Sequence, residues 1–217
     1  MISALPNLSD IEFSVLRWLL GVGVGCGIGL LLGLACWCKW LDRALAVMGG
    51  GARAIPIIGL VPVIQYFWGV SEYGKIGLIA WSIAFPVWVS VHSAALRQDQ
   101  DAELVWIAHN IGASSMLRHY TLPRIMVGFV QGIDIAIGLG WLAVVASELV
   151  GTYTSGFWGG GIGHKLFFAF SAGDWRAGLI CLGLFGVCGV LSTLAWRVLG
   201  VKTITWLTGI SPRTQLS

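Results

Sequence analysis

The stretch SVLRWLLGVGVGCGIGLLLGLACW, residues 14–37, sets the fold class because it is apolar throughout except for one charged side chain, Arg17. The hydrocarbon core of a bilayer is about 30 Å thick, so a spanning helix needs roughly 20 mostly apolar residues. Three further stretches meet this requirement, at about 74–95, 125–148 and 176–199. The sequence therefore predicts an all-α protein, a multi-span transmembrane helical bundle.

A fifth apolar stretch, at about 44–69, is interrupted by a glycine triplet at 49–51, by Arg53, and by Pro56 and Pro62. Proline removes a backbone donor, and lipid cannot satisfy the backbone groups that this frees. We therefore expect an irregular fifth span that faces the interior of the protein, which gives about five spans in total. Pro56 and Pro62 become candidates for lining a solute path.

The composition agrees with a membrane protein. The chain has 217 residues, of which 57% are hydrophobic and 11% charged, and its mean hydropathy is +0.84. Its net charge of +3 comes from scattered Lys and Arg that form no basic face, which argues against a nucleic-acid partner. The five cysteines lie in or beside apolar spans, where Cys behaves as a small hydrophobe. Cys36 and Cys38 have no His cluster nearby, so we expect no metal and no cofactor.

The cationic residues predict the orientation, because Lys and Arg concentrate in cytoplasmic loops. Of the 13 Lys and Arg, four fall on one side of the membrane, namely Arg17, Lys75, Lys165 and Arg176. The other nine fall on the side of the 38–53 and 96–124 connections and the C-terminal tail: Lys39, Arg43, Arg53, Arg97, Arg118, Arg124, Arg197, Lys202 and Arg213. We expect an extracytoplasmic N-terminal segment (1–13), a transmembrane domain (14–200) and a cytoplasmic tail (201–217). The first residues lack the basic start of a signal peptide, so we expect the first span to be retained.

Motifs typical of enzymes fail on their context. Residues 69–76 nearly match a phosphate-binding loop, but Ile76 stands where a hydroxyl must bind magnesium. The GGGIG run at 159–163 follows no predicted strand, so a flexible turn or a re-entrant segment explains it. Ser155 and His164 do not make a serine-nucleophile motif. We expect no catalytic residues.

The most polar part of the chain is RQDQDAELVWIAHNIGASSMLRHYTLP, residues 97–123. It is long enough for a helix, a turn at Gly112 and a second short helix closed by Pro123. Apolar residues recur in its first half at helical spacing. Composition leaves two interpretations open: a helix in the lipid interface, or a helix that docks in a groove on a cytosolic partner.

Ala108, Gly112 and the pair Leu122–Pro123 resemble the cytoplasmic coupling loop of the membrane subunits of bacterial ABC importers, whose pattern is roughly E-A-A-x-x-x-G followed by I-x-L-P. Trp106 stands where that family has Glu, and Glu103 lies one turn earlier. Four stretches resemble the nitrate, sulfonate, taurine and bicarbonate branch: RAIPIIGLVPVIQYFWGVSEYGKI (53–76), DAELVWIAHNIGAS (101–114), GIDIAIGLGWLAVVASELVG (132–151) and GIGHKL (161–166).

This resemblance implies a type I ABC importer permease of the inner membrane, with a cytoplasmic coupling loop at about 97–121. It implies ATPase coupling through Glu103, Trp106, Ala108, Gly112, Ala113, Leu122 and Pro123. Its implied partners are cytosolic ATP-binding subunits, a second permease in a homo- or heterodimer, an extracytoplasmic solute-binding protein and membrane lipid. The implied cargo is a small anionic solute, and the permease itself is not an enzyme. The alternatives are a diverged, non-transporting membrane scaffold and a secondary transporter, whose paired broken repeats we do not find.

Two carboxylates inside the predicted spans are further candidates for the solute path, because a charge that faces lipid is costly. Asp134 could instead pair with a neighbouring span or with Arg124. Glu148 could instead be an interface-exposed carboxylate. Gly132, Gly138 and Gly140 on the same span suit close helix packing.

Overall fold

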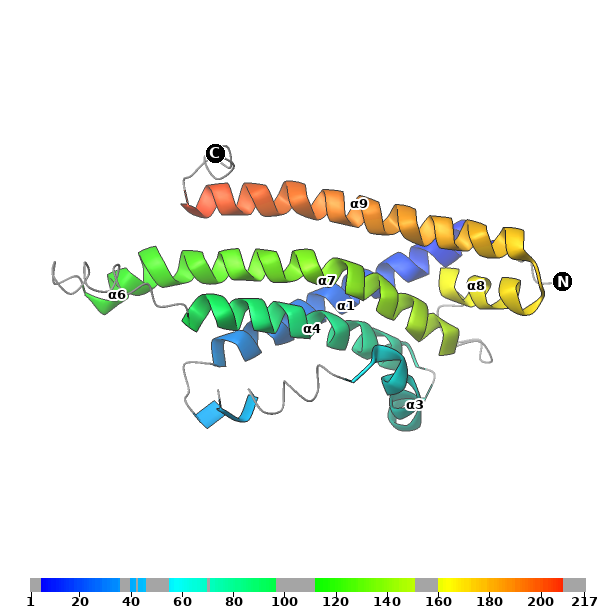
Figure 1. Ribbon diagram of the computed structural model, residues 1–217, viewed down its shortest axis with the longest axis horizontal. Helices are drawn as coiled ribbons and strands as arrows, with labels where there is room; N and C mark the ends of the chain where they lie inside the picture. The colour runs from blue at the N-terminus through cyan, green and yellow to red at the C-terminus, as the bar shows by residue number, and fades with distance from the viewer. Residues whose placement is uncertain are drawn as a thin grey trace.

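The computed structural model describes residues 5–35, 40–41, 43–45, 55–69, 71–96, 112–150 and 160–208. Within these ranges the chain is helical and contains no strand, so the predicted all-α fold is confirmed (Figure 1). The elements are α1 (Leu8–Leu34), α3 (Ile57–Trp68), α4 (Glu72–Leu96), α6 (Ala113–Met116), the π-helical turn η2 (Leu117–Thr121), α7 (Leu122–Val150), α8 (Ile162–Ser171) and α9 (Trp175–Thr208).

Four of the described helices are long and apolar enough to cross a bilayer, namely Leu8–Leu34, Glu72–Leu96, Ser114–Leu149 and Trp175–Gly200. They coincide with the four predicted spans. The first helix begins inside the expected N-terminal segment, and α9 continues beyond residue 200. In the expected fifth span the structure describes α3, a helix of 12 residues with Pro62 inside it.

Helices α1 and α4 run side by side in the same direction, with glycines on α1 facing β-branched residues on α4. Glycines four residues apart on α1 face residues four apart on α4. The pairs are Gly21 with Ile79, Gly25 with Ile83, Gly29 with Val87 and Gly33 with Val91. Each glycine lacks a Cβ, so the two backbones approach closely. The end of α1 and the start of α4 lie at opposite ends of the bundle. Most of the chain from 36 to 54 lies outside the described residues, and the fifth crossing stays a prediction.

Helix α7 packs on α4 in the opposite direction, and glycines again allow the approach. A Cβ added at Gly128 would lie 2.5 Å from Ala94, and one added at Gly132 would lie 2.7 Å from the Val87 backbone. Gly140 is also close-packed, against Trp18. The expectation of close packing is therefore confirmed for Gly132 and Gly140. Gly138 makes no such approach to the described helices, because no described atom lies within 4 Å of an added Cβ.

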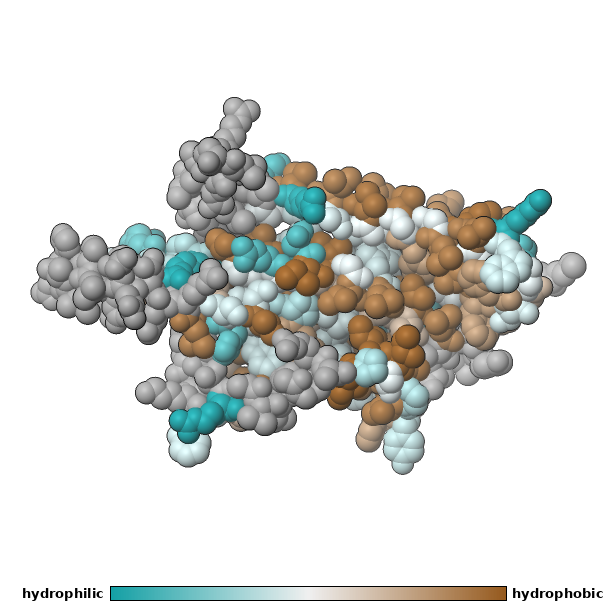
Figure 2. Space-filling view, viewed as in Figure 1, coloured by the Kyte–Doolittle hydropathy of each residue, from teal (hydrophilic) through white to brown (hydrophobic). Residues whose placement is uncertain are grey.

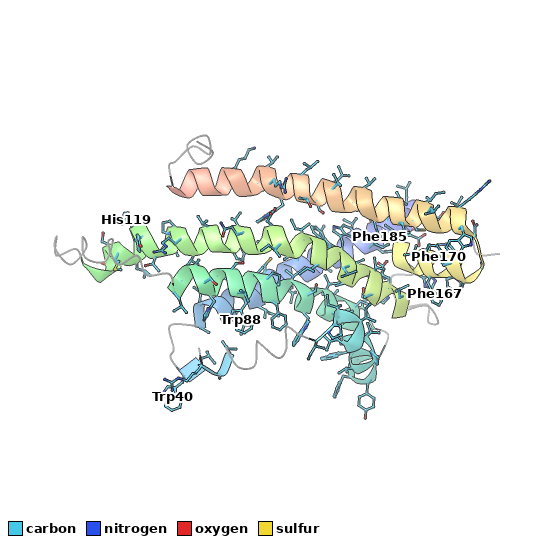
Figure 3. The ribbon with its side chains drawn as sticks, viewed as in Figure 1. Trp40, Trp88, His119, Phe167, Phe170 and Phe185 are labelled. Carbon is cyan, nitrogen blue, oxygen red and sulfur yellow. The ribbon has the colours of Figure 1, made fainter. Side chains whose placement is uncertain are left out.

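Aromatic side chains join α9 to this core. Trp141 of α7 stacks on Trp18 of α1 with ring centroids 5.3 Å apart. Trp141 and Phe185 of α9 pack edge-on, with ring centroids 6.1 Å apart. The Trp141 indole also donates to the Ser192 hydroxyl at 2.9 Å. Figure 3 shows Phe185 between α9 and α7. The core therefore lies between α1, α4 and α7, with α9 along its outside.

The outer surface of α9 is apolar over most of its length (Figure 2). Leu179, Val190 and Leu191 are each about 60% exposed on it. An apolar surface of this extent is unfavourable in water and suits the hydrocarbon of a bilayer. The start of α1 and the end of α9 lie at opposite ends of the bundle, with α8 near the start of α1 and α6 near the end of α9 (Figure 1).

Candidate functional site

The predicted coupling residues fall only partly within the described chain. Glu103, Trp106 and Ala108 lie outside the described residues. Gly112 precedes α6, and its carbonyl accepts the N–H groups of Ser115 and Met116 at 3.0 and 3.2 Å. Among the described residues, no heavy atom lies within 4 Å of a Cβ added at Gly112, and residues 97–111 before it lie outside the described chain. The coupling turn at Gly112 therefore stays a prediction.

The pair Leu122–Pro123 does not end a helix, which corrects the expectation that Pro123 closes a second short helix. A single helix runs over Ser114–Leu149. The turn before the proline is π-helical, and the Leu122 N–H pairs with the Leu117 carbonyl, five residues back. A π turn shifts the backbone hydrogen bonds by one residue, so the helix continues although Pro123 has no N–H to donate. Ala113 begins α6 in the same continuous helix.

A buried charge cluster, formed by Ser14, Arg17, Glu72, Lys75 and Glu148, joins α1, α4 and α7 at the end of the bundle near α8. The Arg17 Nε and Nη2 atoms donate to the two carboxylate oxygens of Glu72 at 2.6 and 2.9 Å. Its Nη1 donates to Glu148 at 2.9 Å, and Lys75 donates to Glu72 at 2.8 Å. The side chains of Arg17 and Glu148 are both fully buried. Two cations and two carboxylates balance, and burial of charge requires this kind of pairing.

Glu148 also caps the start of α8. The N-cap residue Gly161 offers no side chain, so the first N–H groups of α8 need other acceptors. The Gly163 N–H donates to Glu148 at 2.8 Å, and the Ile162 N–H donates to the Ser14 hydroxyl at 2.9 Å. The Ser14 hydroxyl in turn donates to Glu148 at 2.7 Å. A carboxylate at a helix N-terminus also interacts favourably with the helix dipole.

The described glycines at the start of α8 have a packing role, which corrects the flexible-turn alternative of the two expected for this run. A Cβ added at Gly161 would lie 2.4 Å from the Glu148 carboxylate, and one at Gly163 would lie 2.9 Å from the Glu148 Cβ. Gly161 also has a φ of 141°, which only glycine adopts readily. The Gly160 carbonyl accepts a hydrogen bond from Arg17 Nη1 at 2.7 Å. Residues 160–163 are thus held against the charge cluster.

Further charged groups surround this cluster. Lys165 of α8 lies 3.9 Å from the Asp10 carboxylate of α1, and both side chains are buried. Burial lowers the pKa of His164, and the neighbouring Lys165 ammonium lowers it further. His164 therefore favours the neutral form, which adds no charge beside the balanced cluster.

The two carboxylates proposed for the solute path occupy different surroundings. Asp134 is half-exposed and lies 3.9 Å from Arg197 of α9, which agrees with the alternative of a pair with a neighbouring span. Arg124 instead stacks on the Tyr120 ring, 4.7 Å from its centroid. Glu148 is fully buried among hydrogen-bond donors. The alternative of an interface-exposed carboxylate is therefore wrong for Glu148.

A hollow of about 400 Å³ opens between α3, α4 and α7. Its walls include Pro56, Trp81, Phe85, Pro86, Ile135 and Leu139. The α4 residues among these lie near the middle of their helix, so the hollow is at mid-depth of the bundle. Pro56 therefore borders this hollow, and its place on a solute path stays a prediction. Pro62 is exposed and does not border this hollow.

The charge cluster shows what sequence reasoning missed. We used Arg17 and Lys75 only to predict orientation, and Glu72 fell within the rejected phosphate-loop motif. A signal was present, because Arg17 and Glu148 are opposite charges inside two apolar spans, and charges in a membrane tend to pair. Their partners on other helices could not be chosen without the packing.

The chain was compared with known proteins. Residues 25–203 match the family described as binding-protein-dependent transport system inner membrane component. The putative aliphatic sulfonates transport permease protein SsuC of Bacillus subtilis is 27% identical over 203 residues, which cover 90% of this chain and 69% of the relative. The taurine transport system permease protein TauC of Escherichia coli is 27% identical over 173 residues, with 78% and 58% covered. The nitrate import permease protein NrtB of Synechocystis is 26% identical over 168 residues, with 77% and 58% covered.

The relatives are longer than this chain, which spans about six-tenths of the length of the second and third of them. Among solved structures, the inward-facing MetNI methionine ABC transporter matches with a TM-score of 0.63 and 18% identity. The match covers 91% of this chain and 93% of that one. At this identity the match supports the fold alone.

Proposed function

Because this chain belongs to the family of binding-protein-dependent transport system inner membrane components, we propose that it is the permease subunit of an ATP-driven importer for a small anionic solute. The observation that carries the proposal is the family match over residues 25–203, which includes all four long helices in whole or in part. Within the described residues, no group of His, Cys, Asp and Glu could hold a metal ion.

The mechanism that follows is alternating access. ATP hydrolysis by two cytosolic subunits would move the docked segment at about 97–121, and each end state would expose the path to one side of the membrane only. A bundle of about five spans does not enclose a path alone, so a second permease, identical or different, would complete it. An extracytoplasmic binding protein would deliver the solute. The family supports ATPase and binding-protein partners in general.

The outside N-terminus rests on the cation count of nine to four, with the nine on the side of the 97–123 segment. Three of the four cations counted on the outer side, Arg17, Lys75 and Lys165, are buried beside carboxylates.

The orientation predicts a labelling pattern. Ser114→Cys, in a variant whose native cysteines are replaced, should react with a membrane-impermeant maleimide only from the cytoplasmic side, since Ser114 is exposed in α6. Trp175→Cys is the matched control at the opposite end, where Trp175 is 68% exposed, and it should react only from outside. Reaction of Ser114→Cys from outside alone would reverse the topology.

Co-purification of the ATPase tests the proposed function. We expect Trp106→Ala to lower ATPase recovery in detergent, because a buried indole contributes a few kcal/mol to an interface. Gly112→Leu should leave the permease folded, because no described atom lies within 4 Å of an added Cβ, but should uncouple ATP hydrolysis from uptake. Gly183→Leu on α9 is the control, since Gly183 also has no neighbour within 4 Å. If ATPase recovery and uptake are unchanged in both Trp106→Ala and Gly112→Leu, the segment is a mere connector.

A further inference from the structure

The predicted coupling segment, at about 97–121, ends in the π-helical turn η2, directly before α7. No residue of η2 is buried in the described chain. Ile125, four residues after the turn, is 2% exposed and belongs to the core. The packed part of the helix therefore begins just after η2. Wide turns of this kind are rare within helices and occur frequently at functional sites.

Two backbone carbonyls are alternative acceptors for one N–H group in this turn. The N–H of Leu122 pairs with the Leu117 carbonyl, five residues back, whereas in an α-helix it would pair with the Arg118 carbonyl. The π-helical donor to Arg118 would be Pro123, which has no N–H. Transfer of the Leu122 N–H from Leu117 to Arg118 would therefore exchange one hydrogen bond for another, without breaking a contact of the core.

Pro123 favours the π form of the turn. In an α-helix the proline ring clashes with the carbonyl four residues earlier, which is that of His119, and a wider turn relieves this clash. The side chains of η2 make contacts in both directions. His119 Nδ1 lies 3.1 Å from the Ser115 carbonyl of α6, and Arg124 of α7 lies over the Tyr120 ring. These two contacts share no residue, so neither of them ties α6 directly to α7.

We propose that η2 is the joint at which the coupling segment turns on α7, by a change between the π and the α form. The inference rests on the proposed function, because the docked ATPases would drive the change. The extra residue of the wide turn then passes into the helix before it. An α-helix turns about 100° and rises about 1.5 Å per residue, so the part from Gly112 to Met116 rotates by about 100° and shifts by about 1.5 Å. The core and the packed part of α7 stay in place.

The ATPases can drive this change only if they bind the two forms of the segment with different affinity. Such a difference is available, because a rotation of about 100° presents another face of the helix before η2 to a docked partner. Shifts of helices at subunit interfaces are a known means of transmitting a conformational change. The joint therefore converts movement of the ATPases into a rotation that stops at the start of α7.

Distances between spin labels measure this rotation. One label is attached at Ser114→Cys before the turn, and the second at Val198→Cys of α9 or Leu96→Cys of α4, which are exposed positions at the same end of the bundle (Figure 1). The permease lacks its native cysteines and is assembled with its ATPases in lipid nanodiscs. A side-chain tip lies about 5–6 Å from the helix axis, so the rotation displaces it by about 8 Å. We expect at least one distance to shift by several ångströms when a non-hydrolysable ATP analogue is added.

Two variants separate a joint from a fixed wide turn. Pro123→Ala removes the clash and restores an N–H, so it should favour the α form and give the shifted distances without nucleotide. Deletion of His119 removes the extra residue, so it should keep the distances of the resting protein and abolish their response to the ATP analogue. Met126→Ala, one turn after Pro123, leaves the proline in place and is the control, which should behave like the unsubstituted protein.

Unchanged distances in the unsubstituted protein with the ATP analogue would overturn the joint. Unchanged distances in Pro123→Ala, or a response that persists after deletion of His119, would overturn the change between the two forms. In each of these cases the proposed function stands if the ATPase co-purifies and ATP hydrolysis drives uptake. Failure of the ATPase to co-purify would instead overturn the proposed function, and Pro123→Ala compared with the unsubstituted permease alone would still test the turn.

Discussion

Glu148→Ala is expected to destabilise the folded chain by about 3–5 kcal/mol, because it leaves a fully buried guanidinium without one of its two carboxylate partners. Arg17 would keep only Glu72, and the N–H of Gly163 would lose its acceptor. A buried donor without an acceptor adds to the cost. The measurement is the free energy of unfolding in detergent, or the shift in melting temperature.

Asp134→Ala is the matched control for this variant. Asp134 is also a carboxylate on α7 beside an arginine, but its pair with Arg197 is 3.9 Å long and the two side chains are 45% and 67% exposed. Exposed ion pairs of this kind contribute about 0–1 kcal/mol. Similar losses for Glu148→Ala and Asp134→Ala would show that the charge cluster does not hold α1, α4 and α8 together.

Substitution of a glycine of α1 should lower the stability of the protein on the face that packs on α4, and should leave it unchanged or raise it on the opposite face. A Cβ added at Gly29 would lie 2.6 Å from the Ala84 carbonyl oxygen and 2.8 Å from Val87. The backbone oxygen cannot move away without shifting α4, so Gly29→Ala should cost about 1–3 kcal/mol, and Gly29→Leu more. Gly27, two residues away, has no neighbour within 4 Å. Gly27→Ala should be neutral or stabilising by up to about 1 kcal/mol, since alanine favours helix over glycine.

The measurement for this pair is the fraction of each variant recovered as a folded monodisperse species, together with its melting temperature. Gly25→Ala should behave like Gly29→Ala, because an added Cβ there would lie 2.7 Å from the Ala80 carbonyl oxygen. Gly23→Ala should behave like Gly27→Ala, because Gly23 also has open space around it. A loss of stability that is the same at positions 27 and 29 would contradict the packing of α1 on α4.

Several features were predictable because they depend on local sequence. Four spans follow from runs of apolar residues long enough to cross a bilayer, and the structure has helices in the same places. The family follows from stretches such as 132–151 and 161–166, whose resemblance agrees with the match over residues 25–203. Local patterns were less reliable for turns. Pro123 was expected to end a helix, but a π turn accommodates it.

The sequence by itself determined that this chain is a helical membrane protein of the importer permease family, because hydropathy and motif are read residue by residue along the chain. Only the tertiary structure decided which charges pair, since Arg17 and Glu148 are 131 positions apart and meet because α7 packs against both α1 and α4. It also decided that Gly161 and Gly163 pack on a carboxylate, and that Pro56, Pro86 and Ile135 border one hollow. The physical reason is that a helix face has no fixed partner until another backbone approaches it, and that approach depends on contacts between distant segments.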